Sequence, residues 1–243
     1  MSKSKNAIST VNVELFKKMY FYALISVSRR EDKINRLNVF PVPDGDTGSN
    51  VLNTIAGGWE NIKDKEFSTI AELSAAFAKG SLLGARGNSG VISSQIYKGI
   101  AVGLKDAGKT MSPAELKDAF LVAKEYAYKA VSNPIEGTIL SVVSEIAKEA
   151  PKYEFDNFST LLESAYLVAD HAVMNTPNQM KVLKDANVVD SGAYSLQRFL
   201  HGFRKAVSNE EYSISEQDYT KVEENAQRTI AKKAPTKSVA GYC

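Results

Sequence analysis

The stretch from residue 38 to residue 50, NVFPVPDGDTGSN, constrains the fold more than any other part of this chain. Pro41 and Pro43 hold its first half extended, because proline fixes φ and restricts the residue before it. Two carboxylates, Asp44 and Asp46, follow at once, and an apolar pattern with helical spacing begins directly afterwards. The sequence therefore predicts a rigid loop that brings two acidic side chains to the start of a helix.

Such a loop has both properties that a site for a phosphate chain and its magnesium ion requires. Carboxylates bind hard cations, whereas the N-terminus of a helix attracts anions. Gly45 and Gly48 allow tight turns and let backbone N–H groups approach a ligand. Thr47, Ser49 and Asn50 are residue types that commonly cap helices. An Asp-Gly pair alone is most often a simple turn, so this interpretation needs support from the rest of the chain.

Three familiar motifs do not account for the acidic and glycine-rich segments. An EF-hand calcium loop needs glycine at its sixth position and glutamate at its twelfth, where this chain has Ser49 and Ile55. No Walker A sequence is present. Gly84, Gly87 and Gly90 do not follow a strand pattern, which argues against a dinucleotide-binding fingerprint. A nucleotide site would therefore require a different fold.

Composition restricts the class of protein. The chain has 243 residues, of which 44% are hydrophobic, enough for a packed core in one large domain or two small ones. Its net charge of +2 gives no reason to expect nucleic acid or an anionic membrane as a partner. Its one cysteine, Cys243, excludes an internal disulfide and is typical of a reducing compartment. The longest apolar stretch, near residues 20–27, is too short to cross a bilayer. We therefore expect a cytoplasmic protein without membrane insertion.

Apolar residues recur at helical spacing along most of the chain, and we find no convincing strand. The class predicted is all-α, with eight or nine helices and antiparallel neighbours joined by short connections. The segments expected to be helical are residues 15–28, 47–65, 68–82, 90–106, 113–131, 138–146, 159–172, 177–183 and 193–207.

The chain changes character after residue 208. Residues 1–208 are predicted to form one domain, whereas residues 209–243 are polar and have little periodicity. We interpret this second part as a linker that leaves the domain, with a short helix between Val222 and Ala231 as the one expected element.

Three more loops place small or polar residues at the point where a helix begins. They are residues 88–90 (NSG), 136–138 (EGT) and 190–192 (DSG). Each alone is most simply explained as helix capping. If the helices alternate in direction, however, the loops meet at one end of the bundle. Their N–H groups could then bind phosphates while Asp44 and Asp46 hold magnesium.

These motifs resemble a known family. Residues 37–50 are similar to the signature of the DhaL-type kinase domain in bacterial fatty acid kinase A subunits, within the dihydroxyacetone kinase L-subunit superfamily. Residues 83–92, 134–140 and 182–192 match the other signatures of that family, in the same order. The resemblance covers about residues 10–207.

The resemblance implies an eight-helix antiparallel barrel that binds ATP and two magnesium ions at one end. Asp44 and Asp46 would be catalytic and would hold the metal. Asn38, where relatives carry a third aspartate, would be a weaker ligand. The residues expected to contact the nucleotide are Thr47, Gly48, Ser49, Asn50, Asn88, Ser89, Gly90, Thr138, Asp190, Ser191 and Gly192.

The family also implies a reaction, which is phosphoryl transfer from ATP to a fatty acid carried by a separate lipid-binding B subunit, giving an acyl phosphate. A carboxylate acceptor is already ionised at neutral pH, so no general base is needed. Two alternatives remain open: a dihydroxyacetone kinase L-type subunit that keeps its nucleotide, and a non-catalytic nucleotide-binding scaffold.

The last residues of the chain resemble the start of the family's middle domain. We therefore expect the N-terminal domain of a longer protein, weakly active by itself, with a homodimer formed through the downstream region as one option. His171 and His201 lack metal-site spacing relative to Cys243, so no metal is expected there. Both histidines lie in helical patterns and are predicted to be packing or surface residues.

Overall fold

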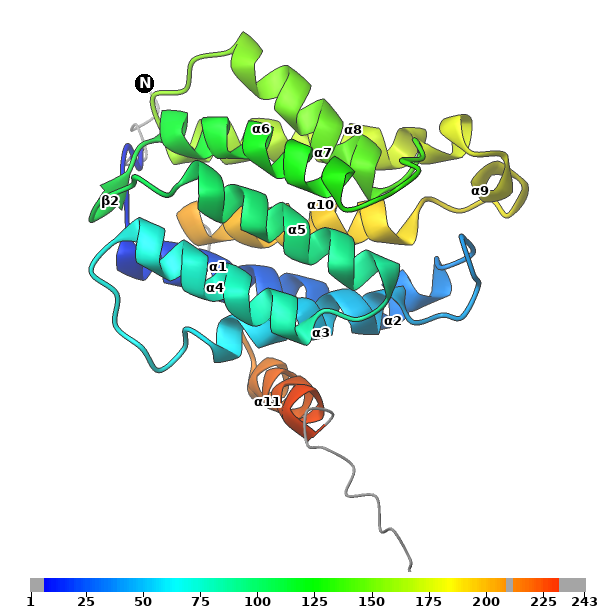
Figure 1. Cartoon of the computed structure of the whole chain (residues 1–243), viewed down its shortest axis with the longest axis horizontal. Helices are drawn as coiled ribbons and strands as arrows, with labels where there is room; N and C mark the ends of the chain where they lie inside the picture. Colours follow the sequence, from blue (N-terminus) through cyan, green and yellow to red (C-terminus); the bar gives the residue numbers. More distant parts are fainter. Residues whose placement is uncertain (1–6, 209–211, 232–243) are drawn as a thin grey trace, which may run out of the picture.

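The computed structural model of this protein describes residues 7–208 and 212–231, and almost all of their regular structure is helical (Figure 1). The one sheet in this part of the chain pairs the two-residue strands β1 (Val11–Asn12) and β2 (Thr110–Met111) in antiparallel register. Strands this short leave no alternating pattern in the sequence. The predicted all-α class is confirmed.

The helices follow one another with short connections. They are α1 (Val13–Ser28), α2 (Glu31–Arg36), α3 (Thr47–Glu60), α4 (Ile70–Gly84), α5 (Gly87–Gly103), α6 (Pro113–Lys129), α7 (Ile139–Glu149), the 3-10 turn η1 (Ala150–Lys152), α8 (Phe158–Gln179), α9 (Lys181–Asp185), α10 (Ser191–Val207) and α11 (Glu216–Ala231).

Within residues 7–208, α2 and α8 differ most clearly from the sequence prediction. Helix α2 has no counterpart in it, because its six residues include a single buried apolar side chain, Ile34. Helix α8 runs through Pro177, where the sequence pattern predicts a new helix. The N–H that this proline lacks falls in the last turn of the helix, and Thr176 still accepts a backbone bond from Met180 there.

An aromatic cluster fills the interior of the bundle. The rings of Tyr20 and Phe77 stack with centroids 3.8 Å apart, and those of Tyr97 and Phe199 stack at 4.7 Å. Phe203 packs against Tyr20 and Phe199. These side chains come from α1, α4, α5 and α10, so the core joins both halves of the chain.

Alternation in helix direction brings four helix starts to one end of the bundle, at the right in Figure 1. These are the N-termini of α3, α5, α7 and α10, which belong to the four motifs singled out in the sequence. Their side chains contact one another or line a common pocket there. The predicted convergence of the loops is thus observed.

The polar segment after residue 208 is not simply a linker. Helix α11 begins at Glu216, six residues earlier than the sequence predicts, and packs against α3 and α1. Val222 is 5% exposed and belongs to the core. Arg29 of the α1 C-terminus anchors α11 to the bundle, because it donates two 2.7 Å hydrogen bonds to the Asp218 carboxylate. Cys243 lies outside the described residues, and the domain boundary at 208 stays a prediction.

No helix in residues 7–208 or 212–231 combines the length and the apolar character needed to cross a bilayer.

Candidate functional site

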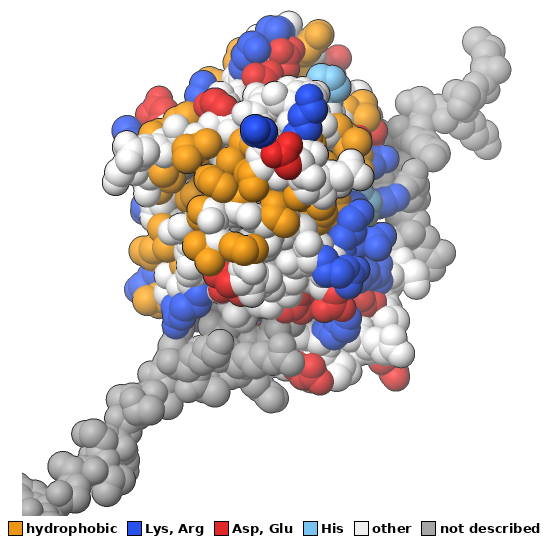
Figure 2. All heavy atoms as spheres, turned by 90° about the vertical axis from the view of Figure 1, so that its right-hand side faces the viewer, with side chains coloured by type: hydrophobic (Ala, Val, Ile, Leu, Met, Phe, Trp, Pro, Cys, Tyr) orange, Lys and Arg blue, Asp and Glu red, His pale blue; other side chains and the backbone are white. Residues whose placement is uncertain are grey.

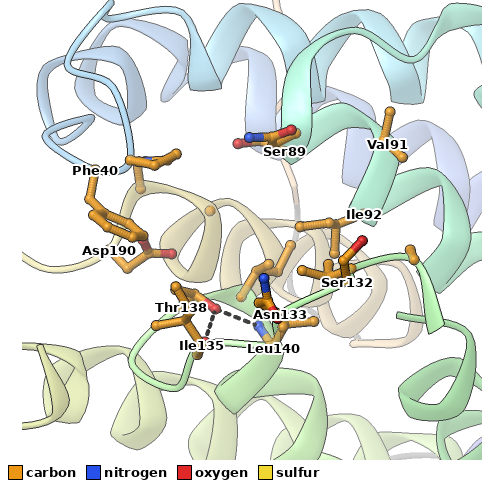
Figure 3. Close-up of a pocket in the computed structure, with 17 residues that line it drawn as sticks. Phe40, Ser89, Val91, Ile92, Ser132, Asn133, Ile135, Thr138, Leu140 and Asp190 are labelled. Carbon is orange, nitrogen blue, oxygen red and sulfur yellow. Dashed lines mark hydrogen bonds between the residues drawn. The ribbon is translucent and has the colours of Figure 1, made fainter. Parts of the chain in front are cut away.

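A pocket of about 430 Å³ opens where the four helix starts meet (Figure 3). Ser89 and Ile92 of α5 face Thr138 and Leu140, at the start of α7, across this space. The lining residues are Phe40, Pro41, Asn88, Ser89, Val91, Ile92, Ala130, Val131, Ser132, Asn133, Ile135, Thr138, Ile139, Leu140, Asp190, Ser191 and Gly192. The walls are mainly apolar, and the polar groups come from helix starts and from Ser132 and Asn133 in the loop after α6.

Hydroxyl groups tie three of the four motifs together beside the pocket. Thr47 Oγ1 donates a short hydrogen bond to Asn38 Oδ1. Ser191 Oγ donates to Thr47 Oγ1 over 3.2 Å, and Ser89 Oγ lies 3.5 Å from the same atom. Thr47 and Ser191 are buried. This cluster fixes the starts of α3, α5 and α10 relative to one another.

The acidic loop lies at the edge of this cluster and exposes both carboxylates. Asn38 Nδ2 donates to Asp44 Oδ1 over 2.9 Å and to the Val42 carbonyl over 2.8 Å. The Asp46 carboxylate forms no hydrogen bond or ion pair with any part of the chain that the structure describes. Gly45, at φ +69°, makes the turn between the two aspartates. Free carboxylate oxygens therefore face solvent next to the pocket.

The start of α3 already has a partner for its N–H groups. Asn35 Oδ1 on α2 accepts from the N–H of Gly48 at 2.7 Å and of Ser49 at 3.2 Å. Ser49 Oγ donates to Glu31 Oε1 at 2.8 Å. The sequence predicts that Gly48 and Ser49 contact phosphate, but in this structure their N–H groups already donate to Asn35 of α2. Asn35 was not identified from the sequence, because it lies thirteen residues before Gly48 on a helix that was not predicted.

Two glycines in the first turn of α5, Gly87 and Gly90, allow it to pack closely against α3. Gly87 adopts φ +58°, and a Cβ there would lie 2.6 Å from Asn50 Nδ2. A Cβ on Gly90 would lie 2.8 Å from Thr54 Oγ1. Asn50 and Gly90, both predicted to contact nucleotide, therefore shape the α3–α5 contact and do not line the pocket. Asn88, between the two glycines, does line it.

Glu136 holds the loop before α7, a role that the sequence did not reveal. Its carboxylate accepts from Tyr128 Oη at 2.7 Å and from Ser141 Oγ. Ser141 Oγ in turn accepts from the N–H of Gly137, which has φ +84°. Burial and the bond to Glu136 raise the pKa of Tyr128 to about 12. The loop that carries Thr138 is thus fixed to both α6 and α7.

Asp190 lies buried at the start of α10, between two helix N-termini. Its Oδ2 accepts from the N–H of Ala193 at 2.7 Å, and its carboxylate also accepts from the N–H groups of Gly192 and Ile139. Burial nevertheless raises the pKa of Asp190 to about 6. The Asp190 N–H donates to Thr176 Oγ1 at 3.0 Å. This residue links α10, α7 and α8.

The donor set fits a magnesium ion that is shared with a ligand. Among the described residues, no three His, Cys, Asp or Glu side chains are grouped as they would be in an all-protein metal site. The pair Asp44 and Asp46 could supply part of a coordination shell, which Mg²⁺ commonly completes with water and phosphate oxygens. No Lys or Arg of the described chain lines the pocket. Anion binding there would depend on helix N-termini, hydroxyls and the cation.

Fold and site together define an all-α bundle with a pocket formed by helix starts beside an acidic loop. The family model for the DAK2 domain matches residues 41–205. The chain therefore belongs to the DAK2 domain family, and the DhaL-type family predicted from the motifs is confirmed.

Proteins with related sequences occur in staphylococci. Uncharacterized proteins of Staphylococcus epidermidis and Staphylococcus aureus are each 40% identical to this chain over 205 residues, which is 84% of it. One of Staphylococcus haemolyticus is 39% identical over the same length. The chain spans 37% of the length of each of these relatives.

Among solved structures, the fold resembles the dihydroxyacetone kinase from C. freundii in complex with AMP-PNP and Mg²⁺. The TM-score is 0.59 at 17% sequence identity, over 84% of this chain and 36% of that one. The native form of the same enzyme gives a TM-score of 0.55. At this identity the likeness establishes the shared fold.

Proposed function

We propose that this chain binds ATP with magnesium and supports phosphoryl transfer to a fatty acid presented by a separate lipid-binding subunit. The observation that carries the proposal is a pocket lined by the N-termini of α5, α7 and α10, with the start of α3 and two exposed carboxylates, Asp44 and Asp46, beside it. The relatives are longer than this chain, so the activity of the whole protein belongs to the proposal.

Asp44 and Asp46 would hold magnesium, which when bound neutralises phosphate charge. Asn38 would orient Asp44, to which it already donates a hydrogen bond. Its amide oxygen is buried and already accepts from the Thr47 hydroxyl, and a neutral amide oxygen is a weaker ligand than a carboxylate. The two aspartates are therefore the primary ligands proposed, and Asn38 is the secondary one.

The nucleotide would lie in the pocket with its phosphates toward the helix starts. Ser89, Thr138 and Ser191 would donate to phosphate oxygens, together with N–H groups of the first turn of α5, which has no side-chain cap. The apolar walls near Phe40 and Ile92 would take the base. A volume of about 430 Å³ lies within the usual range for small-ligand sites.

Supporting the choice of a lipid acceptor, the end of the bundle that carries the pocket also carries exposed apolar side chains. Val42, Val91 and Ile135 are 59%, 42% and 46% exposed. Figure 2, which looks onto this end, shows apolar side chains gathered across the middle of the face. A lipid-carrying subunit would dock there. Because the carboxylate of a fatty acid is ionised, the chain's residues need only position it and exclude water.

Calorimetric titration with a non-hydrolysable ATP analogue, with and without Mg²⁺, tests the site. We expect magnesium-dependent binding by the wild-type chain and its loss in Asp44→Ala/Asp46→Ala with unchanged helical content. The matched control is Asp64→Ala/Asp156→Ala, which removes two exposed carboxylates elsewhere. Unaltered binding by the first variant would show that the metal assignment is wrong.

The acceptor is tested separately with the longer protein. Transfer of labelled phosphate from ATP to a fatty acid bound by its carrier subunit would support the proposal. Transfer to dihydroxyacetone instead, or to neither acceptor while nucleotide still binds, would contradict the lipid assignment and leave the nucleotide site intact.

A further inference from the structure

A second polar cluster lies farther along α10, where Arg198 is seven residues, or about 10 Å, from Ser191. It comprises Arg30 at the α1–α2 junction, Tyr166 of α8, and Tyr194, Arg198 and His201 of α10. We call these five residues the Arg198 niche. None of them lines the pocket described above.

Arg198 is poorly satisfied for a half-buried cation. Its Nη2 donates to Ser26 Oγ at 3.1 Å, whereas its Nε is buried and has no hydrogen-bond partner among the described residues. No carboxylate in the same part of the chain pairs with Arg198 or with Arg30. Burial, together with the nearby charge of Arg30, lowers the pKa of Arg198. An unpaired charge removed from water is costly unless a partner of opposite charge binds it.

His201 is a neutral donor in this cluster. Ser26 accepts from Arg198, so its hydroxyl proton is available to His201 Nδ1, which lies 3.2 Å away. The ring proton then resides on Nε2. Burial, and then the charges of Arg198, Arg204, Lys205 and Arg30, lower the pKa of His201 to about 4. The imidazole is therefore uncharged at neutral pH and can donate through Nε2.

Two tyrosine hydroxyls add donors beside the guanidinium. Gln197 Nε2 donates to Tyr166 Oη at 3.2 Å, which leaves the hydroxyl proton of Tyr166 free to be donated. Tyr194 Oη has no hydrogen-bond partner within residues 7–208 and 212–231, and Lys33 Nζ lies 4.7 Å from its ring centroid. Donors and positive charge thus accumulate here, and the described residues provide no carboxylate paired with them.

Both acidic side chains of α8, and Asp218 of α11, already have other partners. Arg204 pairs with Glu163. Asp170 accepts from Gln197 at 2.9 Å, and Asp218 accepts from Arg29. These neighbours therefore supply no counter-ion for Arg30 and Arg198.

We propose that the Arg198 niche binds a phosphate group, at a site separate from the nucleotide pocket. A phosphate offers several acceptor oxygens and matches the fork of an arginine bidentately. It would satisfy Arg198 and Arg30 together and accept from Tyr166, Tyr194 and His201 Nε2. Figure 2 shows that Lys and Arg side chains gather beside the apolar face on the same end of the molecule.

The two histidines of the chain give a direct test by nuclear magnetic resonance of their ring carbons and protons. Inorganic phosphate is added at constant ionic strength, with nucleotide analogue and magnesium already saturating. We expect the His201 signals to shift saturably and the pKa of His201 to rise by about one unit. His171, on α8 and exposed, should not respond.

Variants and a second anion make the test specific. Arg198→Gln should abolish the response, whereas Arg198→Lys should keep part of it. Lys129→Gln, which removes one exposed charge from α6, should leave it unchanged. An unmoved His201 in the wild-type chain, an undiminished response in Arg198→Gln, or an equal response to acetate would each overturn the proposal.

Discussion

At the scale of single residues, Asp190 combines a capping role with an unusual ionisation. Its carboxylate accepts from N–H groups at the starts of α7 and α10, which favours the charged form, yet it is 5% exposed. Burial outweighs those bonds and leaves the pKa at about 6. The residue type was predictable from the sequence as a helix cap, whereas its burial depends on α7, which the sequence could not place beside it.

A pH dependence follows from this raised pKa. The folded state binds the Asp190 proton more tightly than the unfolded chain, in which the ordinary value is 3.8. Protonation of Asp190 therefore makes its full contribution to the free energy of unfolding below about pH 4. This contribution decreases as the pH rises to about 6, by at most about 1.4 kcal/mol per pH unit. We expect Asp190→Asn, which cannot ionise, to gain stability relative to wild type across that window.

Urea denaturation of both proteins at several pH values between about 4 and 7 measures this difference, and the other carboxyl groups cancel in the comparison. Parallel free-energy curves for the two proteins would contradict the assigned pKa shift.

At the scale of helices, glycines set how closely the elements pack. A Cβ at Gly99 of α5 would lie 2.5 Å from Ala123 Cα of α6, and one at Gly57 of α3 would lie 2.7 Å from the Gly80 carbonyl oxygen of α4. These contacts involve backbone atoms, which cannot move aside as a flexible side chain can. The pairs α5–α6 and α3–α4 therefore come into close backbone contact at these glycines.

We expect Gly99→Ala to destabilise the protein by about 3 kcal/mol, because overpacking forces α5 away from α6. Gly108→Ala is the matched control, since no atom lies within 4 Å of the added Cβ. Thermal unfolding of both variants measures the effect. Equal melting temperatures for the two would show that the α5–α6 contact can relax.

The sequence was most informative where a local rule determines an element. The predicted helix over residues 113–131 is present as α6, and it begins at a capping box of Ser112 and Glu115 with a proline in its first turn. Helix α2 and the Asn35 cap depend on contacts with α3, so no local pattern announces them. The same distinction applies to the candidate site. The motifs could be identified from the sequence, but packing between distant segments decides which of their groups face the pocket.

At the scale of the whole molecule, α11 connects the late part of the described chain to its beginning. Arg29 also donates to the Ser213 carbonyl, and the Tyr219 ring lies 5.5 Å from that of Phe21. Hydrogen bonds from Arg29 hold the pKa of Asp218 far below its usual range. The anchor should therefore weaken only at a pH well below the one at which an ordinary aspartate is protonated.

Asp218→Ala should release α11 from the bundle. Losing the charged hydrogen bonds should cost its docking about 2 kcal/mol, while the aromatic core remains folded. Hydrogen exchange would then be faster in α11 and unchanged in α5. Asp156→Ala, at another aspartate, is the control. Unchanged protection of α11 would mean that apolar contacts alone hold it.

The hydroxyl cluster beside the pocket also has a consequence for synthesis of the chain. Ser191 contacts Asn38 across 153 positions of sequence. Contacts between residues so far apart in the sequence form late, after the intervening chain has been ordered. A nascent chain emerging from the ribosome lacks one wall of the pocket until α10 has been translated. A ligand of this pocket would therefore bind only after α10 has been synthesised. It would protect complete domains from proteolysis but not shorter nascent chains.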